Sequence, residues 1–283
     1  MSSPAGRTAT FRFEGHKLSY SEYGDGPRTT VLIHGLLLSK RMHRPLAEAL
    51  AARGNHVVTI DLLGHGRSDR PAEMWNYGMP YFARQIVALL DHLGVDEAVI
   101  AGTSLGANVT LETAVLAPER VRGTVIEMPV LDNALLGCAL AFTPLMLALT
   151  VGEPAARVLS RVTRLIPNQR LPFLLDIGLG TVQQDPKPSA GVLQGLFFQR
   201  VAPPREERRK IQARSLVIGH RRDPVHPFSD SGMLVDELPN ARLLEADSIL
   251  ELRIAPERLT DEISEFVDEC WKPRAAPRAR RAS

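Results

Sequence analysis

Short apolar runs alternate with amphipathic stretches along the first part of the chain. Runs rich in β-branched residues occupy 29–33, 56–60 and 98–101, and stretches with helical periodicity occupy 40–53 and 81–93. Because parallel strands need crossover connections, this order predicts a mostly parallel sheet of about eight strands with helices on both faces. Two earlier runs, 10–13 and 17–20, predict an antiparallel hairpin at the sheet edge.

The alternation stops after a strand-like run at 124–128 and resumes at 215–219. The residues between are rich in Leu, Ala, Met and Phe and are interrupted by prolines, a pattern typical of short apolar helices. We therefore expect a helical cap over 131–207, inserted into a core formed by 1–130 and 208–271. Part of its apolar surface should line a pocket, since a cap over an apolar substrate needs an apolar underside.

The composition is that of a globular chain without a strong charge. Of its 283 residues 44% are apolar, which is enough to bury a substantial core. The 34 basic and 32 acidic side chains leave a formal charge of +2, too little to indicate a nucleic acid or an anionic membrane as the main partner. We therefore expect a small-molecule substrate or ligand, no nucleic acid and no membrane, while the oligomeric state stays open.

The sequence gives no sign of export, membrane insertion or metal binding. The first residues lack the apolar core of a secretory signal, and no apolar run reaches the roughly 18 residues of a membrane span, so we expect a cytoplasmic protein. Cys138 and Cys270 lie far apart without metal-ligand spacing, which predicts free thiols. No motif implies a metal or an organic cofactor. The basic segment 272–283, rich in Pro and Ala, is expected to be a disordered tail.

The strongest chemical signal is the GxSxG motif of Gly102, Ser104 and Gly106. It follows a short apolar strand and precedes the helical stretch 107–116, so Ser104 falls on a sharp strand-to-helix turn that would lift its hydroxyl above the sheet. The small residues at 102 and 106 let the chain turn without a clash. Ser104 is therefore the candidate nucleophile.

A second loop, His34-Gly35-Leu36, follows the first parallel strand. The backbone N–H groups of Leu36 and Leu105 could converge on a developing alkoxide and form an oxyanion hole. Such preorganised donors often supply the largest single contribution to catalysis. His34 is expected to orient this loop rather than take part in the chemistry.

These segments resemble the α/β-hydrolase superfamily, in the branch of small cap-bearing esterases, lactonases and C–C bond hydrolases. The resemblance spans about residues 10 to 270 and implies an α/β-hydrolase fold with an inserted helical cap. In that family a strand that ends in glycine and is followed closely by an aspartate carries the acid of the catalytic triad. The segment 215–223 matches this pattern, which makes Asp223 the acid, with Asp132 after the preceding strand as the alternative.

The chain departs from the family at the general base. The family's histidine lies on the loop after the last strand, but 227–283 contains no histidine, and the corresponding segment here is 247–253. Three candidates for the base remain, namely His226, Glu251 if desolvation raises its pKa, and His43 on the helix after the oxyanion loop. The other alternative is that hydrolysis has been lost or diverted, because a serine without a base is a poor nucleophile.

The motifs are compatible with two classes of function. We favour a serine hydrolase acting on a small or medium apolar ester or lactone, with Ser104 as nucleophile, Asp223 as acid and a non-standard or impaired base. The alternative is a protein that keeps the pocket without hydrolysis, either a small-molecule binder or sensor or a cofactor-free cyclase or lyase. The intact GxSxG motif favours the enzyme, whereas the missing histidine favours the alternative.

Overall fold

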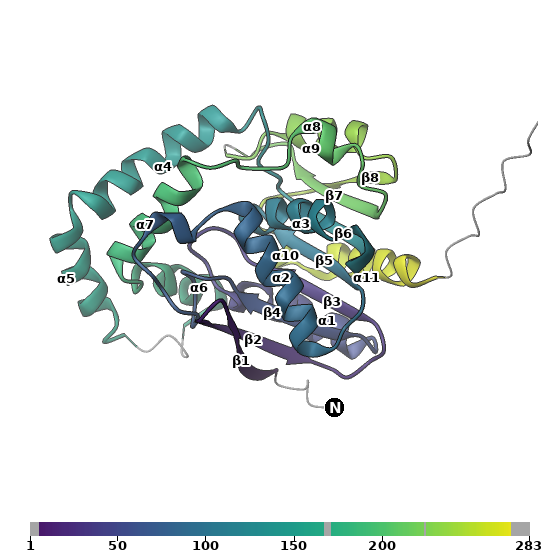
Figure 1. Ribbon diagram of the computed structural model, residues 1–283, viewed down its shortest axis with the longest axis horizontal. Helices are drawn as coiled ribbons and strands as arrows, with labels where there is room; N and C mark the ends of the chain where they lie inside the picture. The colour runs from purple at the N-terminus through teal and green to yellow at the C-terminus, as the bar shows by residue number, and fades with distance from the viewer. Residues whose placement is uncertain (1–5, 167–170, 224, 273–283) are drawn as a thin grey trace, which may run out of the picture.

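The computed structural model describes residues 6–166, 171–223 and 225–272, and an eight-stranded sheet forms its centre (Figure 1). The strands are β1 (Arg7–Phe13), β2 (His16–Tyr23), β3 (Thr29–Ile33), β4 (His56–Asp61), β5 (Ala98–Thr103), β6 (Val121–Glu127), β7 (Arg214–His220) and β8 (Ala241–Ala246). Their order across the sheet is β1-β2-β4-β3-β5-β6-β7-β8. β1 pairs with β2, and β2 with β4, in antiparallel fashion, and every other pair is parallel. The predicted mostly parallel sheet is confirmed.

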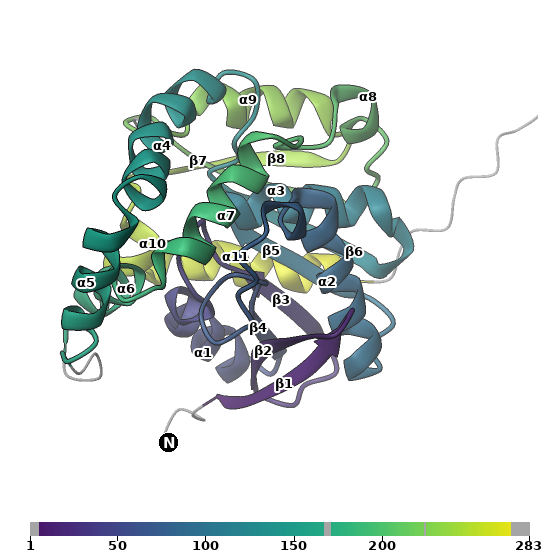
Figure 2. The ribbon, with the colours of Figure 1, turned by 60° about the vertical axis from the view of Figure 1, so that its left-hand side comes forward.

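Helices cover both faces of the sheet (Figure 1, Figure 2). One face carries α2 (Met79–Leu93), α3 (Leu105–Leu116) and α9 (Phe228–Glu237), and the other carries α1 (Arg44–Ala52) and α11 (Glu257–Trp271). Shorter helical segments are η1 (Lys40–His43), η2 (Met74–Asn76), η3 (Pro118–Arg120), α8 (Arg205–Arg208) and α10 (Glu251–Ile254). Alternate residues of β3 enter the two cores, Val31 and Ile33 on the α2 side and Leu32 on the α1 side. Because both faces of β3 are covered, the strand appears in the sequence as an unbroken apolar run.

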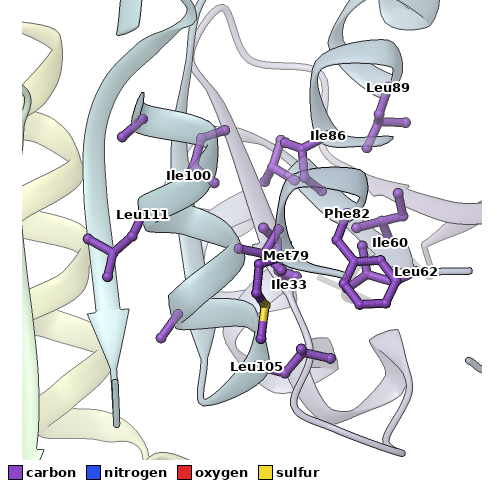
Figure 3. Packing of buried hydrophobic residues seen from close by; sticks show 14 of the residues in the cluster. Ile33, Ile60, Leu62, Met79, Phe82, Ile86, Leu89, Ile100, Leu105 and Leu111 are labelled. Atoms are coloured by element: carbon purple, nitrogen blue, oxygen red, sulfur yellow. The ribbon is translucent and has the colours of Figure 1, made fainter. Parts of the chain in front are cut away.

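The core on the α2 side joins the central strands to α2 and α3 (Figure 3). Phe82, Ile86 and Leu89 project from one face of α2 into this core, and all three are fully buried. Their spacing of four and three residues is the helical periodicity visible in the sequence. α2 ends at Gly94, whose φ of 64° lies in the left-handed region that glycine adopts readily.

Between β6 and β7 the chain leaves the sheet and forms α4 (Leu135–Thr150), α5 (Glu153–Thr163), α6 (Phe173–Val182) and α7 (Pro186–Phe197). None of the described residues from 128 to 213 belongs to a strand. Most of α7 is buried, whereas α4 has no buried residue. Figure 2 shows these helices on one side of the sheet with α4 and α5 at the outer edge. The limits 131–207 and the role of a cap stay predictions.

Buried polar side chains tie both ends of this insertion to the core. Asn108 Nδ2 on α3 donates to the backbone oxygens of Val130 (2.8 Å) and Val201 (2.7 Å), which flank the insertion. The Asp230 carboxylate on α9 accepts backbone N–H groups from 131–134 at 2.8 to 3.1 Å. Since both side chains are fully buried, breaking these bonds would leave polar groups without partners, so they fix where the insertion begins and ends.

No single described helix is long and apolar enough to cross a membrane. Only when α4 and α5 are taken together are they long and apolar enough for a membrane span, and the two helices are bent by 89° relative to each other. The tail predicted over 272–283 lies, apart from Lys272, outside the described residues.

Gly106 marks a close approach of α3 to the sheet, and its replacement tests this packing. A Cβ atom at 106 would lie 2.1 Å from the backbone oxygen of Ile33. We therefore expect Gly106→Ala to lower the free energy of unfolding by about 3 kcal/mol, measured by urea denaturation. The matched control is Gly178→Ala in α6, where a Cβ meets no atom within 4 Å and helix propensity predicts a gain of about 0.5–1 kcal/mol. Equal stabilities of the two variants would contradict the close approach.

Candidate active site

The candidate nucleophile lies on a strained turn between β5 and α3. Ser104 has φ 54° and ψ −111°, a backbone conformation that residues other than glycine rarely adopt. Its N–H donates to the backbone oxygen of Glu127 at the end of β6 (2.8 Å). A Cβ atom on Gly102 would lie 2.1 Å from the backbone oxygen of Gly106. The turn therefore requires glycine at 102, in keeping with the GxSxG motif.

The Ser104 hydroxyl is hydrogen-bonded to the imidazole of His226. Ser104 Oγ lies 2.9 Å from His226 Nε2, and His226 Nδ1 lies 2.9 Å from Asp223 Oδ2. Asp223 and His226 belong to one short loop after β7, and Asp223 Oδ1 accepts the N–H groups of Val225 (2.8 Å) and His226 (2.9 Å). Pro224, between Asp223 and Val225 in the sequence, lies outside the described residues. The structure thus brings together three of the predicted site residues, a serine, an imidazole and a carboxylate.

Asp223 is held as a carboxylate beside the imidazole. Its side chain is 3% exposed, and burial acts to raise its pKa. Hydrogen bonds from the side chain and backbone of His226 and from the backbone of Val225 outweigh burial, so the pKa of Asp223 lies below its ordinary value of 3.8. A carboxylate facing Nδ1 favours the tautomer that carries its proton there. Nε2 then presents its lone pair to the serine hydroxyl.

Ser104 lines a cavity of about 250 Å³. The wall is almost entirely apolar and consists of Leu36, Met79, Ser104, Leu105, Asn108, Val130, Leu135, Cys138, Ala139, Phe142, Leu193, Leu196, Phe197 and Val201. Leu36 and Leu105, the predicted oxyanion donors, line the same cavity as the serine. Burial raises the pKa of the Cys138 thiol to about 11, so this thiol stays protonated at neutral pH.

An ion pair occupies the position where the family's histidine loop is expected. Arg253, at the end of the segment 247–253 after β8, donates from Nη2 to Thr103 Oγ1 (2.9 Å) and pairs through Nη1 with the Glu127 carboxylate. Thr103 Oγ1 donates to the second oxygen of Glu127 (2.5 Å). Burial acts to raise the pKa of Glu127, but the charge and hydrogen bond of Arg253 outweigh it and hold the pKa below its ordinary value. Both charged side chains are nearly inaccessible, at 3% and 7% exposed.

Thr103, Glu127 and Arg253 were not among the predicted site residues. Two features of the sequence point to them, a glutamate in the otherwise uncharged strand-like run 124–128 and an arginine in the segment that replaces the histidine loop. Charged residues are rarely buried unless they are paired, so each of these two needed a partner of opposite charge. Periodicity alone could not show that the two meet.

Glu251, one of the predicted bases, has other partners. Both of its carboxylate oxygens accept hydrogen bonds from Arg258 at 2.8 Å, and one also accepts the N–H of Asp247 at 2.6 Å. This carboxylate therefore fastens the segment after β8 to α11. It is not positioned to take the proton of Ser104.

His43 and Asp132, the remaining alternatives, also lie apart from the serine. His43 Nε2 lies 3.0 Å from the backbone oxygen of Ile33, and burial lowers the pKa of His43 to about 3. The side chain of Asp132 is 72% exposed and faces Arg208 at 4.0 Å. Neither group is in place to act on the Ser104 hydroxyl.

His34 serves the loop that carries Leu36. Its Nε2 accepts the N–H of Leu62 (3.1 Å), and its Nδ1 lies 2.8 Å from the backbone oxygen of Gly35. Burial lowers the pKa of His34, so the ring is neutral at physiological pH. Within the described part of the chain, no group of three or more His, Cys, Asp or Glu side chains is arranged to hold a metal ion.

A family model described as the alpha/beta hydrolase fold matches residues 30–248. The chain belongs to the α/β-hydrolase family. The match covers β3 to β8 and the insertion between β6 and β7, so it includes every residue of the Ser104–His226–Asp223 cluster.

The relatives of this α/β hydrolase include several hydrolases. Bifunctional epoxide hydrolase 2 of Mus musculus is 36% identical over 108 residues, which are 38% of this chain and only about a fifth (19%) of that protein. RutD of Pseudomonas savastanoi pv. phaseolicola, named as a carbamate hydrolase, is 30% identical over 241 residues, or 81% of this chain and 88% of that protein. The enol-lactonase of Burkholderia xenovorans LB400 has the same fold, with a TM-score of 0.72 at 20% identity over 92% of this chain and 100% of that one. These relatives support a hydrolase.

Arg253→Met tests the buried ion pair of this α/β hydrolase. Without the guanidinium, Glu127 loses its buried partner, and we expect the free energy of unfolding at neutral pH to fall by about 3–5 kcal/mol in urea denaturation. The pKa of Glu127 is lower in the folded state than its ordinary value of 4.5. The ion pair therefore contributes its full stability at a pH above 4.5, and this contribution is lost as the pH falls through the lowered pKa. The difference between variant and wild type should therefore shrink at acid pH.

Arg221→Met is the matched control for this measurement. Arg221 pairs with Glu245 at the surface, where the two side chains are 68% and 44% exposed. Loss of such a pair should cost less than about 1 kcal/mol. Equal losses of unfolding free energy in Arg253→Met and Arg221→Met would contradict the conclusion that burial makes the Glu127–Arg253 pair important for stability.

Proposed function

We propose that this chain is a serine hydrolase that cleaves small or medium apolar esters or lactones. The observation that carries the proposal is the pair of hydrogen bonds, each 2.9 Å long, from Ser104 through His226 to Asp223. A serine hydroxyl needs a base to act as a nucleophile at neutral pH, and an imidazole oriented by a carboxylate recurs on unrelated folds for this purpose. In this proposal the base is not lost but sits three residues after the acid, on the loop after β7 instead of the loop after β8.

The proposed reaction has two steps. Ser104 Oγ attacks the carbonyl carbon while His226 Nε2 takes its proton, and the same proton then passes to the leaving alkoxide. From an ester an alcohol departs, from a lactone the ring opens to a hydroxyacyl group, and in both cases the acyl group stays on Ser104. In the second step a water molecule gives a proton to Nε2, and its oxygen attacks the acyl carbon. The carboxylic acid leaves as Ser104 recovers its proton. Asp223 keeps the imidazole in position and stabilises the imidazolium.

Backbone N–H groups are the proposed stabilisers of the oxyanion. Leu105 is the first residue of α3, where N–H groups have no acceptor within the helix. Leu36 follows the strand β3 and lines the same cavity as Ser104. Two donors at this place would stabilise the negative charge that develops on the carbonyl oxygen in each step.

The apolar cavity supports an apolar acyl or lactone group as the substrate. None of the described residues that line it is charged. Besides the serine and the Cys138 thiol, the polar side chain among them is that of Asn108, which is already hydrogen-bonded to Val130 and Val201. A charged substrate group would therefore be desolvated there without a partner. This favours hydrocarbon over charged acyl chains.

Substitution of the three clustered residues tests the proposal. With p-nitrophenyl butyrate we expect Ser104→Ala and His226→Ala to lower kcat by about 10⁴-fold or more, and Asp223→Asn by a comparable factor. The effects should be similar because the three residues act together, and each substitution disables the whole cluster. Glu251→Gln should stay within about threefold of the wild type, since its carboxylate lies elsewhere.

A fluorophosphonate label separates loss of the nucleophile from loss of the fold. Intact mass should show a single adduct on the wild type and on Glu251→Gln and none on Ser104→Ala. Near-background turnover in the wild type and in Ser104→Ala, with no adduct on either, would sink the hydrolase proposal and favour the small-molecule binder.

Acyl-chain length tests the assignment of the cavity. We expect kcat/KM to rise about fourfold per added CH₂ from p-nitrophenyl acetate upward until the cavity is full, because each buried CH₂ contributes about 0.8 kcal/mol. Ala139→Phe places a ring in the cavity and should shift the preference to shorter chains. Ala148→Phe is the matched control, since Ala148 lies on the same helix and is exposed to solvent. The same length profile in both variants would contradict the assignment.

A further inference from the structure

Helix α4 is apolar on two opposite faces. Its 16 residues include no charged side chain. One face, with Leu135, Cys138, Ala139 and Phe142, lines the active-site cavity. The opposite face and the residue after the helix carry large side chains at helical spacing that are more than half exposed, namely Leu136 (72%), Leu140 (70%), Leu147 (54%) and Val151 (79%).

The outward face of α4 differs from that of an ordinary core helix. An all-apolar helix in a globular protein is normally buried, yet none of the residues of α4 is buried. Figure 1 and Figure 2 both place α4 and α5 along the outer edge of the molecule. An exposed apolar surface of this kind marks a site of interaction.

Helix α5 adds positive charge beside a second apolar stripe. Val158, Leu159 and Val162 are each more than half exposed, as is Leu165 just after the helix. Residues 135–166 contain three arginines and one acidic residue. The single acid, Glu153, pairs with Arg157, and no described carboxylate pairs with the exposed Arg161 or with Arg164, whose Nε donates to the backbone oxygen of Gln183 (2.8 Å).

We propose that the outward faces of α4 and α5 dock onto a bilayer surface that contains anionic phospholipids. Leucine and valine side chains would enter the boundary between headgroups and acyl chains, and Arg161 and Arg164 would meet the phosphate groups. This proposal departs from the expectation of no membrane partner, which rested on the net charge of the whole chain.

A second copy of the chain fits this surface less well. A two-fold contact presents the same patch twice, so Arg161 and Arg164 of both copies would gather at one interface. Like charges placed together across an interface are unfavourable, whereas an anionic surface attracts them. The charge pattern therefore favours lipid over self-association.

Docking in this orientation would put the bilayer and the cavity on opposite faces of one helix. Helix α4 would then be the element that separates an apolar ester dissolved in the bilayer from the cavity that contains Ser104. The docking surface itself contains no reacting group, so it stands independently of the proposed hydrolysis.

Co-sedimentation of the full chain with vesicles tests the proposal. We expect the wild type to pellet with vesicles of phosphatidylcholine and phosphatidylglycerol, to bind vesicles of phosphatidylcholine alone at least about fivefold more weakly, and to be released by high salt, because salt screens the arginines. Ser104→Ala should bind as the wild type does, which separates docking from catalysis.

Surface variants with matched controls locate the contact. Leu136→Gln with Leu140→Gln should weaken binding at least about tenfold, and Arg161→Glu about fivefold or more. The controls are Leu116→Gln with Leu243→Gln, which are exposed on α3 and β8, and Arg209→Glu, exposed next to α8, and each should bind within about twofold of the wild type. Circular dichroism checks that every variant is folded.

Three results would overturn the proposal. The first is a wild type that does not pellet with anionic vesicles. The second is equal weakening by the test and control variants. The third is a wild-type dimer in light scattering that Leu136→Gln with Leu140→Gln converts to a monomer while vesicle binding stays unchanged, which would assign the surface to a second copy of the chain.

Discussion

The backbone turn at Ser104 is the constraint on which the rest of the site depends. A positive φ at a serine is unfavourable and persists only where the surroundings hold it. Here the N–H of Ser104 is bonded to the end of β6, and Gly102 and Gly106 pass too close to backbone atoms to carry a side chain. The central strands thus determine where the hydroxyl lies, and the remaining groups of the site are arranged around it.

The ion pair of Glu127 and Arg253 connects this turn to the C-terminal part of the chain. Glu127 holds the turn through its backbone, while its carboxylate needs a cation because water does not reach it. The segment after β8 supplies that cation from the position where relatives are expected to carry a base. With an arginine there, the imidazole that contacts Ser104 comes from another loop, the one after β7.

The fold, and candidate residues for the proposed site, could be predicted from the sequence. Alternating apolar runs identified the parallel sheet because both faces of strands such as β3 are covered. Ser104 and Asp223 could be singled out as candidates because their motifs are local. The position of His226 was harder to predict, since its contact with Ser104 spans 122 residues of sequence and depends on how the loop after β7 turns. The pairing of Glu127 with Arg253 across 126 residues left no periodic pattern at all.

Because Asp223 and His226 share one loop, the Ser104–His226–Asp223 cluster assembles from two pieces of chain rather than three. Hydrogen bonds from the backbone and side chain of His226 to Asp223 set the distance between carboxylate and imidazole locally. Only the contact between His226 and Ser104 joins distant parts of the sequence. We therefore expect changes in the segment after β8 to alter the free energy of unfolding, while the relative positions of the carboxylate and the imidazole are set within a single loop.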